Sequence, residues 1–219
     1  MAQFTQNERR ETYHRFMDAA ESVFIRFGYE GASIRMISRE AAAPLGTLHH
    51  YWGSKEVLFR ETCERRFAPI LARQSERLAE CERRLDAGEP LAADTLLRAL
   101  IEPSMLGDGG RGKGSAADAT RQLYGRVLTE PSEVVQRTVR DLLQTPADKF
   151  SSLMRRCNNE PTEQRFYWRM TCAMGAFIFA QSFGDRVAYA GGESLGDVDW
   201  DFVVEEIVGF IKRGMASTS

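Results

Sequence analysis

The stretch between Gly28 and Ser54 constrains the fold most, because residues that end and start helices follow one another there at short intervals. Gly28 is suited to end a helix, and Ser33 is suited to cap the start of a second one. Pro44 fits the first turn of a third helix, and Gly53 breaks that helix before Ser54 caps a fourth. The spacing predicts short helices that are joined by tight turns.

An amphipathic helix precedes this stretch. Apolar residues recur at helical spacing over residues 13–27, and Thr5 with Glu8 fits a capping box at the start of the helix. Residues 41–43 are three alanines, which form a short turn between the second and the third helix. Two helices joined by such a turn, packed on a first helix, make a helix-turn-helix.

Helical patterns continue to the end of the chain. We expect further helices at about residues 54–85, 91–105, 116–129, 131–157, 161–183 and 198–213. No segment alternates between apolar and polar residues as a half-buried strand does. The sequence therefore predicts an all-α protein, with a three-helix head at residues 1–53 and a larger helical domain at residues 54–219.

Composition excludes several classes of protein. No apolar run approaches the roughly 18 residues that span a bilayer, and the first residues are charged where a signal peptide is apolar. We therefore expect a cytoplasmic protein with no membrane contact. The four cysteines form no C-x-x-C pair, which favours free thiols and no metal site; they are Cys63, Cys81, Cys157 and Cys172.

Charge gives little help in identifying a partner. The net charge of the chain is −2, and its first 66 residues carry 10 Lys or Arg against 9 Asp or Glu. A nucleic-acid site in this head must therefore depend on where its charges lie, because their sum supplies little long-range attraction.

The segment GYEGASIRMISREAAAPLGTLHHYWGSKEVLF resembles the signature of the TetR family of transcription regulators. The matching features are Gly-Tyr after the first helix, Ser before the second, Gly-Thr-Leu in the third, an aromatic residue near its end, and Ser-Lys-Glu-x-Leu. The resemblance covers about residues 10–65. It implies a homodimer that binds double-stranded operator DNA, usually as a repressor that a small-molecule effector releases from a palindromic site.

The third helix has two faces. Leu48 and Trp52 lie four residues apart on one face, which we expect to pack on the first two helices. The other face then points toward a major groove, where histidines reach base edges, Leu45 meets a thymine methyl, and hydroxyls and Lys55 contact phosphates. The residues expected to contact DNA are Ser33, Arg35, Leu45, Gly46, Thr47, His49, His50, Tyr51 and Lys55.

The segment departs from the family pattern in and just after the turn. Ala42 occupies a position that is often glycine in the family, and if the turn requires a positive φ there, alanine costs about 1 kcal/mol. Pro44 replaces the usual capping serine, Leu45 a polar or basic residue, and His49 a tyrosine. The operator sequence therefore cannot be copied from a relative.

The resemblance also assigns roles to the rest of the chain, as a regulatory and dimerisation domain. The last two helices are expected to pair with those of a second subunit, although the same apolar faces fit a core within one chain. The residues assigned to this interface are Phe166, Met174, Phe177, Ile178, Phe202, Ile207, Phe210 and Ile211.

A pocket for an apolar or amphipathic effector is expected among the middle helices. Its candidate residues are Met105, Arg121, Tyr124, Phe150, Met154, Trp168, Arg169 and Met170. Arg121 or Arg169 would pair with a carboxylate if either faces inward. A filled core with surface arginines explains the same residues equally well.

Three rival functions remain open. Residues 107–114 match G-x-G-x-x-G and nearly match a phosphate-binding loop, but Gly114 replaces the Ser or Thr that would reach magnesium, and no strand precedes the loop. A linker is the favoured interpretation of this segment. A dimeric helical adaptor that binds no DNA is the second rival. The third is catalysis, for which no catalytic residues, cofactor or nucleophile pair emerge from the spacing.

Overall fold

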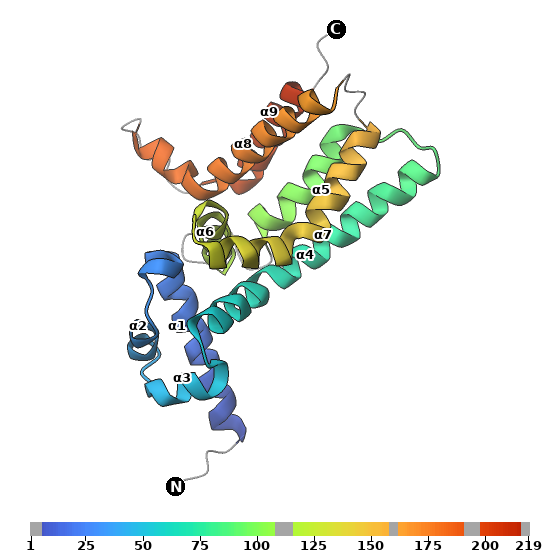
Figure 1. Ribbon diagram of the computed structural model, residues 1–219. Helices are drawn as coiled ribbons and strands as arrows, with labels where there is room; N and C mark the ends of the chain where they lie inside the picture. Colours follow the sequence, from blue (N-terminus) through green and yellow to red (C-terminus); the bar gives the residue numbers. More distant parts are fainter. Residues whose placement is uncertain (1–5, 108–115, 158–161, 191–197, 216–219) are drawn as a thin grey trace. The chain divides into compact units, whose positions relative to one another are not determined.

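A computed structural model describes residues 6–107, 116–157, 162–190 and 198–215, and every regular element within these ranges is a helix (Figure 1). This confirms the all-α prediction. The helices are α1 Gln6–Gly31, α2 Ile34–Glu40, α3 Leu45–Trp52, α4 Lys55–Asp86, α5 Ala93–Leu106, α6 Ala116–Thr129, α7 Glu133–Cys157, α8 Glu163–Ala190 and α9 Trp200–Met215.

Ser33 and Gly53 start and end helices as expected, whereas Gly28 kinks α1 and does not end it. Ser33 caps α2, since its hydroxyl accepts a hydrogen bond of 3.2 Å from the backbone N–H of Met36. Gly28 has a φ of 69° and kinks α1, and helical turns continue beyond it to Gly31. Gly53, with a φ of 68°, ends α3. Thr5 lies outside the described residues.

The turn between α2 and α3 forces one alanine into a glycine-like conformation. Ala42 has a φ of 48°, and no other non-glycine residue in the described ranges has a positive φ. The N–H groups of Ala42 and Ala43 donate to the carbonyls of Arg39 and Ser38, at 3.1 and 3.2 Å. These two bonds form a Schellman motif, whose left-handed position favours glycine. The expectation of a positive φ at Ala42 is therefore confirmed.

We expect Ala42→Gly to raise the free energy of unfolding by up to about 1 kcal/mol, because glycine removes the steric cost of the left-handed conformation. Urea denaturation measures this change. Ala43→Gly is the matched control and should lower stability, since it adds freedom to the unfolded chain without relieving strain. Equal destabilisation by both substitutions would contradict the assignment of strain to Ala42.

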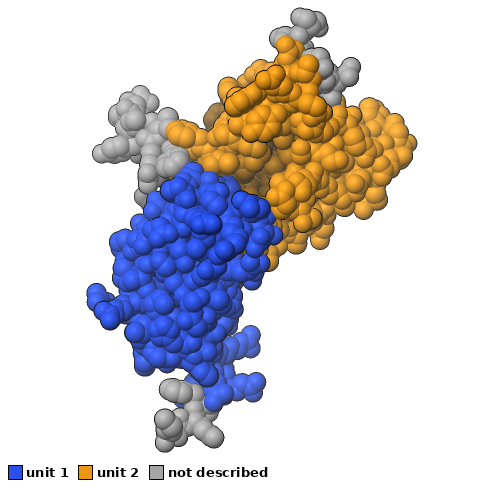
Figure 2. Space-filling model, viewed as in Figure 1, with its two compact units in different colours: residues 1–67, 126–141 blue, residues 68–125, 142–219 orange. Residues whose placement is uncertain are grey.

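The chain forms two compact units (Figure 2). Unit 1 consists of Met1–Phe67 and Arg126–Asp141, and unit 2 consists of Ala68–Gly125 and Leu142–Ser219. The helices α4, α6 and α7 each contribute residues to both units. The functional division at residues 53 and 54 remains a prediction.

Each unit has its own apolar core. In unit 1, Phe24 and Tyr29 both meet the ring of Phe59 with centroids 5.0 Å apart, which fixes α1 on α4. In unit 2, α9 packs on α5 and on α8. Arg98 of α5 makes two bonds of 2.6 Å to the carboxylate of Glu205, a bidentate geometry that orients α9.

The helix α8 is longer than expected and has apolar residues on more than one face. It continues to Ala190, seven residues beyond the predicted end at 183. Phe166 and Phe177 are buried, whereas Tyr167, Trp168 and Phe179 are more than half exposed. An apolar surface therefore remains on α8 after the core of unit 2 is formed.

Candidate nucleic-acid interface

The inner face of α3 is fixed by two buried side chains, as the sequence predicts. Leu48 is 0% exposed and Trp52 is 4% exposed. The indole ring of Trp52 stacks on Tyr13 at 5.3 Å and meets the edge of Phe16 at 5.7 Å, so α3 is held against α1. Burial of these large side chains is the main stabilising term for such a short helix.

The carboxylate of Glu61, which no sequence pattern identifies, completes this anchor. Glu61, on α4, accepts a hydrogen bond of 2.5 Å from Nε1 of Trp52 and another from the hydroxyl of Tyr13. Burial, together with the hydrogen bond to Glu61, raises the pKa of Tyr13 to about 12, so this hydroxyl keeps its proton at neutral pH. Glu61 thus joins α1, α3 and α4.

The opposite face of α3 is open. Gly46, His49 and His50 are exposed, and Leu45 and Thr47 are half-buried. A Cβ atom added at Gly46 would meet nothing within 4 Å, so a large surface can approach the backbone of the helix there. The structure therefore leaves Gly46, His49 and His50 accessible on a firmly held helix, with Leu45 and Thr47 only partly accessible beside them.

Other predicted contact residues have partners within the chain. The hydroxyl of Tyr51 donates to the carbonyl of Arg9 at 3.1 Å, which fastens α3 to the first turns of α1. The hydroxyl of Ser33 caps α2, while Arg35 is exposed on α2. Tyr51 and Ser33 thus have structural roles, and their contact with phosphates remains a prediction.

Lys55 closes the end of α1. Its Nζ donates to the carbonyls of Tyr29 and Ala32, at 2.8 and 3.1 Å, and lies 4.1 Å from the centre of the Tyr29 ring. An ammonium group has three donors, so one N–H is left for a phosphate. The sequence indicated a phosphate contact alone and missed the capping of α1.

We expect Lys55→Met to lower the free energy of unfolding by about 1–3 kcal/mol, because two carbonyls lose a charged donor. If the third N–H binds a phosphate, the plot of log affinity for DNA against log salt should also become less steep, by the amount that about one phosphate contact contributes. Urea denaturation and a salt titration of DNA binding measure the two effects. An unchanged slope would assign Lys55 to the fold alone.

Two further groups of polar side chains hold the head in shape. Arg15 donates to the carbonyl of Ala42 at 3.0 Å and so supports the turn before α3. Glu21, which is 5% exposed, accepts hydrogen bonds from Arg65 and Arg66 on α4. Because these residues are far apart in the sequence, no local pattern identifies them.

The residues predicted to line an effector pocket fall into two groups. Met105, Arg121, Tyr124, Phe150 and Met154 are buried in unit 2. Arg169 and Met170 are half-buried, with Nη1 of Arg169 donating to the carbonyl of Met215 at 3.1 Å. Trp168 is 58% exposed, so its side chain lies on the surface of the protomer.

The residues predicted to form a subunit interface also differ in how far they are exposed. Four are already buried in the protomer, and their surface is not available to a partner: Phe166, Phe177, Ile207 and Ile211. Met174 and Ile178 are half-buried. Phe202 and Phe210 remain 61% and 62% exposed. The helical period alone could not separate these groups, because both helices are apolar on more than one face.

The glycine-rich segment begins at the end of α5. Gly107 ends α5 with a φ of 54°, and residues 108–114 lie outside the described ranges. Within those ranges, no three His, Cys, Asp or Glu side chains gather as a metal site requires. The helices described are also too short or too polar to cross a membrane.

Two family models match the chain. The model described as bacterial regulatory proteins of the tetR family matches residues 16–62, which include α2, α3 and most of α1. The model described as a tetracyclin repressor-like C-terminal domain matches residues 98–214. The second match alone spans more than half of the chain. No curated protein matches the chain.

Solved structures share the fold over nearly the whole chain. A TetR-like transcriptional regulator from a Rhodococcus species has a TM-score of 0.58 and 20% identity, with 99% of this chain and 100% of that chain covered. The regulator FadR from Bacillus subtilis, solved in complex with stearoyl-CoA, has a TM-score of 0.57 and 13% identity, with coverage of 93% and 100%. These likenesses concern the fold alone.

Proposed function

Because the chain belongs to the TetR family of transcription regulators, we propose that it is a repressor whose dimer binds a palindromic operator until a small-molecule effector releases it. The observation that supports this most is the geometry of α3. One face is locked by Leu48 and Trp52, and the other face is exposed. A rigid helix with a free face is the element that reads a major groove in a helix-turn-helix.

The proposed contacts follow from the chemistry of that face. His49 and His50 are exposed and carry ring nitrogens that can bond to purine N7 or O6. In this proposal Leu45 touches a thymine methyl, and Gly46, which has no side chain, allows the closest approach. Arg35, Thr47 and Lys55 supply contacts to phosphates, which position the helix without reading sequence.

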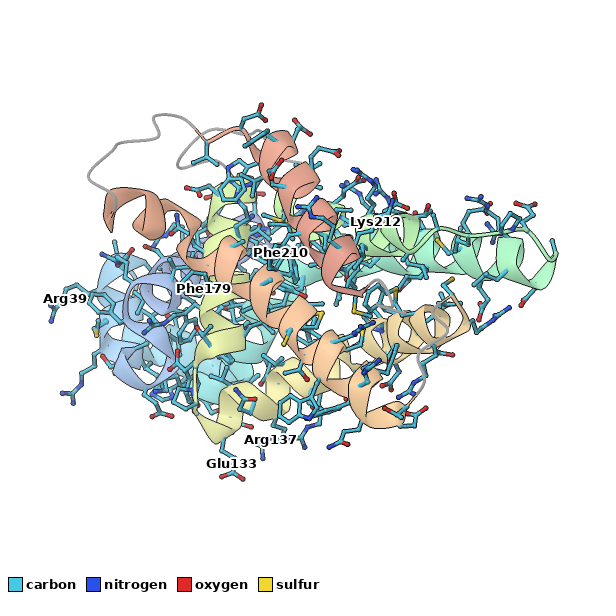
Figure 3. The ribbon with its side chains drawn as sticks, turned by 90° about the horizontal axis from the view of Figure 1, so that it is seen from above. Arg39, Glu133, Arg137, Phe179, Phe210 and Lys212 are labelled. Carbon is cyan, nitrogen blue, oxygen red and sulfur yellow. The ribbon has the colours of Figure 1, made fainter. Side chains whose placement is uncertain are left out.

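The proposed homodimer uses the apolar surface that α8 and α9 leave exposed. Figure 3 looks onto these helices, with Phe179 of α8 and Phe210 of α9 labelled. Both rings are more than half exposed, and so is Phe202. Aromatic side chains of this kind dominate subunit interfaces. To bind both half-sites of a palindrome, such a two-fold dimer must hold its two copies of α3 about 34 Å apart, which is one turn of DNA.

The proposed effector site lies in the interior of unit 2, among the buried pocket candidates. An effector shifts the protein only if it binds the DNA-binding and the released states unequally. We propose that α4 transmits the effect of the bound effector to the head, because this helix runs from the head into unit 2. Pro69 lies inside α4 and leaves the carbonyl of Arg65 without its usual helical donor, which makes the helix easier to bend there.

Selection of bound DNA from a random pool with the purified protein tests the proposal. We expect a two-fold symmetric sequence with half-sites about 10 base pairs apart. Failure to enrich any sequence, with no salt-sensitive binding to DNA, would favour the helical adaptor instead. Tight ATP or NAD binding that Lys113→Ala abolishes would favour a nucleotide-binding protein. As a regulator of this type, the protein would act in the cytoplasm and catalyse no reaction.

A further inference from the structure

Arg121 of α6 holds a charged group in the interior of unit 2, with 2% of the residue exposed. Its Nη1 donates to the carbonyl of Met105 at 2.8 Å, and Nη2 lies 3.6 Å from a carboxylate oxygen of Asp118. The ring of Trp200 lies 4.1 Å from the guanidinium carbon. The buried Nε has no hydrogen-bond partner within the described residues. The charge is therefore only partly compensated.

Gln181 of α8 is a second incomplete group, and it is 5% exposed. Its Nε2 donates to the carbonyl of Ser104 at 3.4 Å, while the buried Oε1 has no partner in the part of the chain that the structure describes. Ser104 and Met105 are consecutive residues near the end of α5. Gln181 and Arg121 thus reach the same turn of α5 from two different helices.

The helices α6 and α8 approach closely beside these two groups. A Cβ atom added at Gly125 would lie 2.4 Å from the hydroxyl oxygen of Ser182. Gly125 follows Arg121 by one helical turn, and Ser182 is the neighbour of Gln181 in the chain. The unpartnered donor of Arg121 and the unpartnered acceptor of Gln181 therefore belong to one layer of the interior.

Capping of α5 explains this layer only in part. It accounts for Nη1 of Arg121 and Nε2 of Gln181, which satisfy carbonyls at the negative end of a helix. It leaves Nε and Oε1 without a function, and a neutral side chain would bond to a carbonyl without the cost of burying a guanidinium. A buried arginine with a free donor is suited to bind a carboxylate.

We infer that the effector is an amphipathic organic acid, whose carboxylate accepts from Nε of Arg121 and whose neighbouring hydroxyl donates to Oε1 of Gln181. A carboxylate only accepts hydrogen bonds, so the hydroxyl is needed to satisfy the glutamine oxygen. The apolar tail lies among fully buried side chains such as Met105 and Leu123. This inference rests on the proposed effector site in unit 2.

Three probes with the same ten-carbon chain test the inference by titration calorimetry on the full-length protein. They are decanoate, 2-hydroxydecanoate and 1-decanol, each kept below the concentration at which it aggregates. We expect decanoate to bind at least about tenfold more tightly than decanol, and 2-hydroxydecanoate to bind more tightly still. Equal affinity for acid and alcohol, or no binding of either acid, would overturn the inference.

Variants separate recognition of the acid from stability. Arg121→Met should abolish the preference for acid over alcohol, and Gln181→Leu should abolish only the gain from the hydroxyl. Arg77→Met is the control, because Arg77 is an exposed arginine of α4 that pairs with Glu102 at the surface. This variant should show the same preferences among the three probes as the wild type. An acid preference that survives in Arg121→Met would refute the site. Selection of DNA by the same preparations tests the proposed function separately.

Discussion

Leu48→Ala is expected to lower the free energy of unfolding by about 2–5 kcal/mol, because it removes a fully buried side chain from a tightly packed core. Leu48 is one of the two buried side chains that hold α3 against the rest of unit 1. Without it, a helix of eight residues has too little intrinsic stability to keep its place. The variant should therefore lose specific DNA binding as well as stability. Thermal and urea denaturation measure the first effect, and a gel-shift titration measures the second.

Leu45→Ala is the matched control, since it is the same chemical change in the same helix. Leu45 is only half-buried, whereas Leu48 is 0% exposed. We expect it to cost less stability than Leu48→Ala and to change the preferred base at one position of each half-site. If Leu48→Ala leaves stability unchanged, or if both variants lose the same stability, the division of α3 into an anchored and a reading face is incorrect.

Phe210→Glu is expected to weaken the dimer by about 100-fold or more, because an aromatic contact at the centre of an interface contributes on the order of 2–4 kcal/mol. A buried, unpaired carboxylate adds to this loss. The ring is 62% exposed in the protomer, so the protomer itself should remain folded. Analytical ultracentrifugation measures the association. DNA affinity should fall with it, since one head reads only one half-site.

Phe27→Glu supplies the comparison for this prediction. Phe27 is also an exposed phenylalanine, at 43%, but it lies on α1 in unit 1. Its substitution should leave the association of subunits unchanged. A stable dimer of Phe210→Glu, or equal dissociation of both variants, would show that the exposed face of α9 is not the interface.

The helix boundaries of the head could be predicted because single residues determine them. Ser33 supplies a hydroxyl for α2, and Gly53 adopts a conformation that other residues avoid. The strain at Ala42 was also predictable, since the turn requires a left-handed residue in that place whatever the side chain. In the larger domain, local preferences did not predict the end of α8, which lies at Ala190 and not at residue 183.

The partners of the polar residues could not be predicted from spacing. Glu61 bonds to Trp52 and Tyr13 only because three helices meet at one point. The capping role of Lys55 depends on the end of α1, which lies more than twenty residues earlier in the chain. In the same way, the helical period shows that α8 and α9 are apolar, but it cannot show which rings face the core and which remain exposed.

Repeated selection of DNA from a random pool tests most directly whether α3 reads base edges, with the wild type, His49→Ala, His50→Ala and Leu45→Ala in parallel. We expect the wild type to select a palindrome and His50→Ala to select the same palindrome with relaxed preference at one position in each half-site. Identical selected sequences for the wild type, His49→Ala, His50→Ala and Leu45→Ala would contradict the assignment of this face to base recognition.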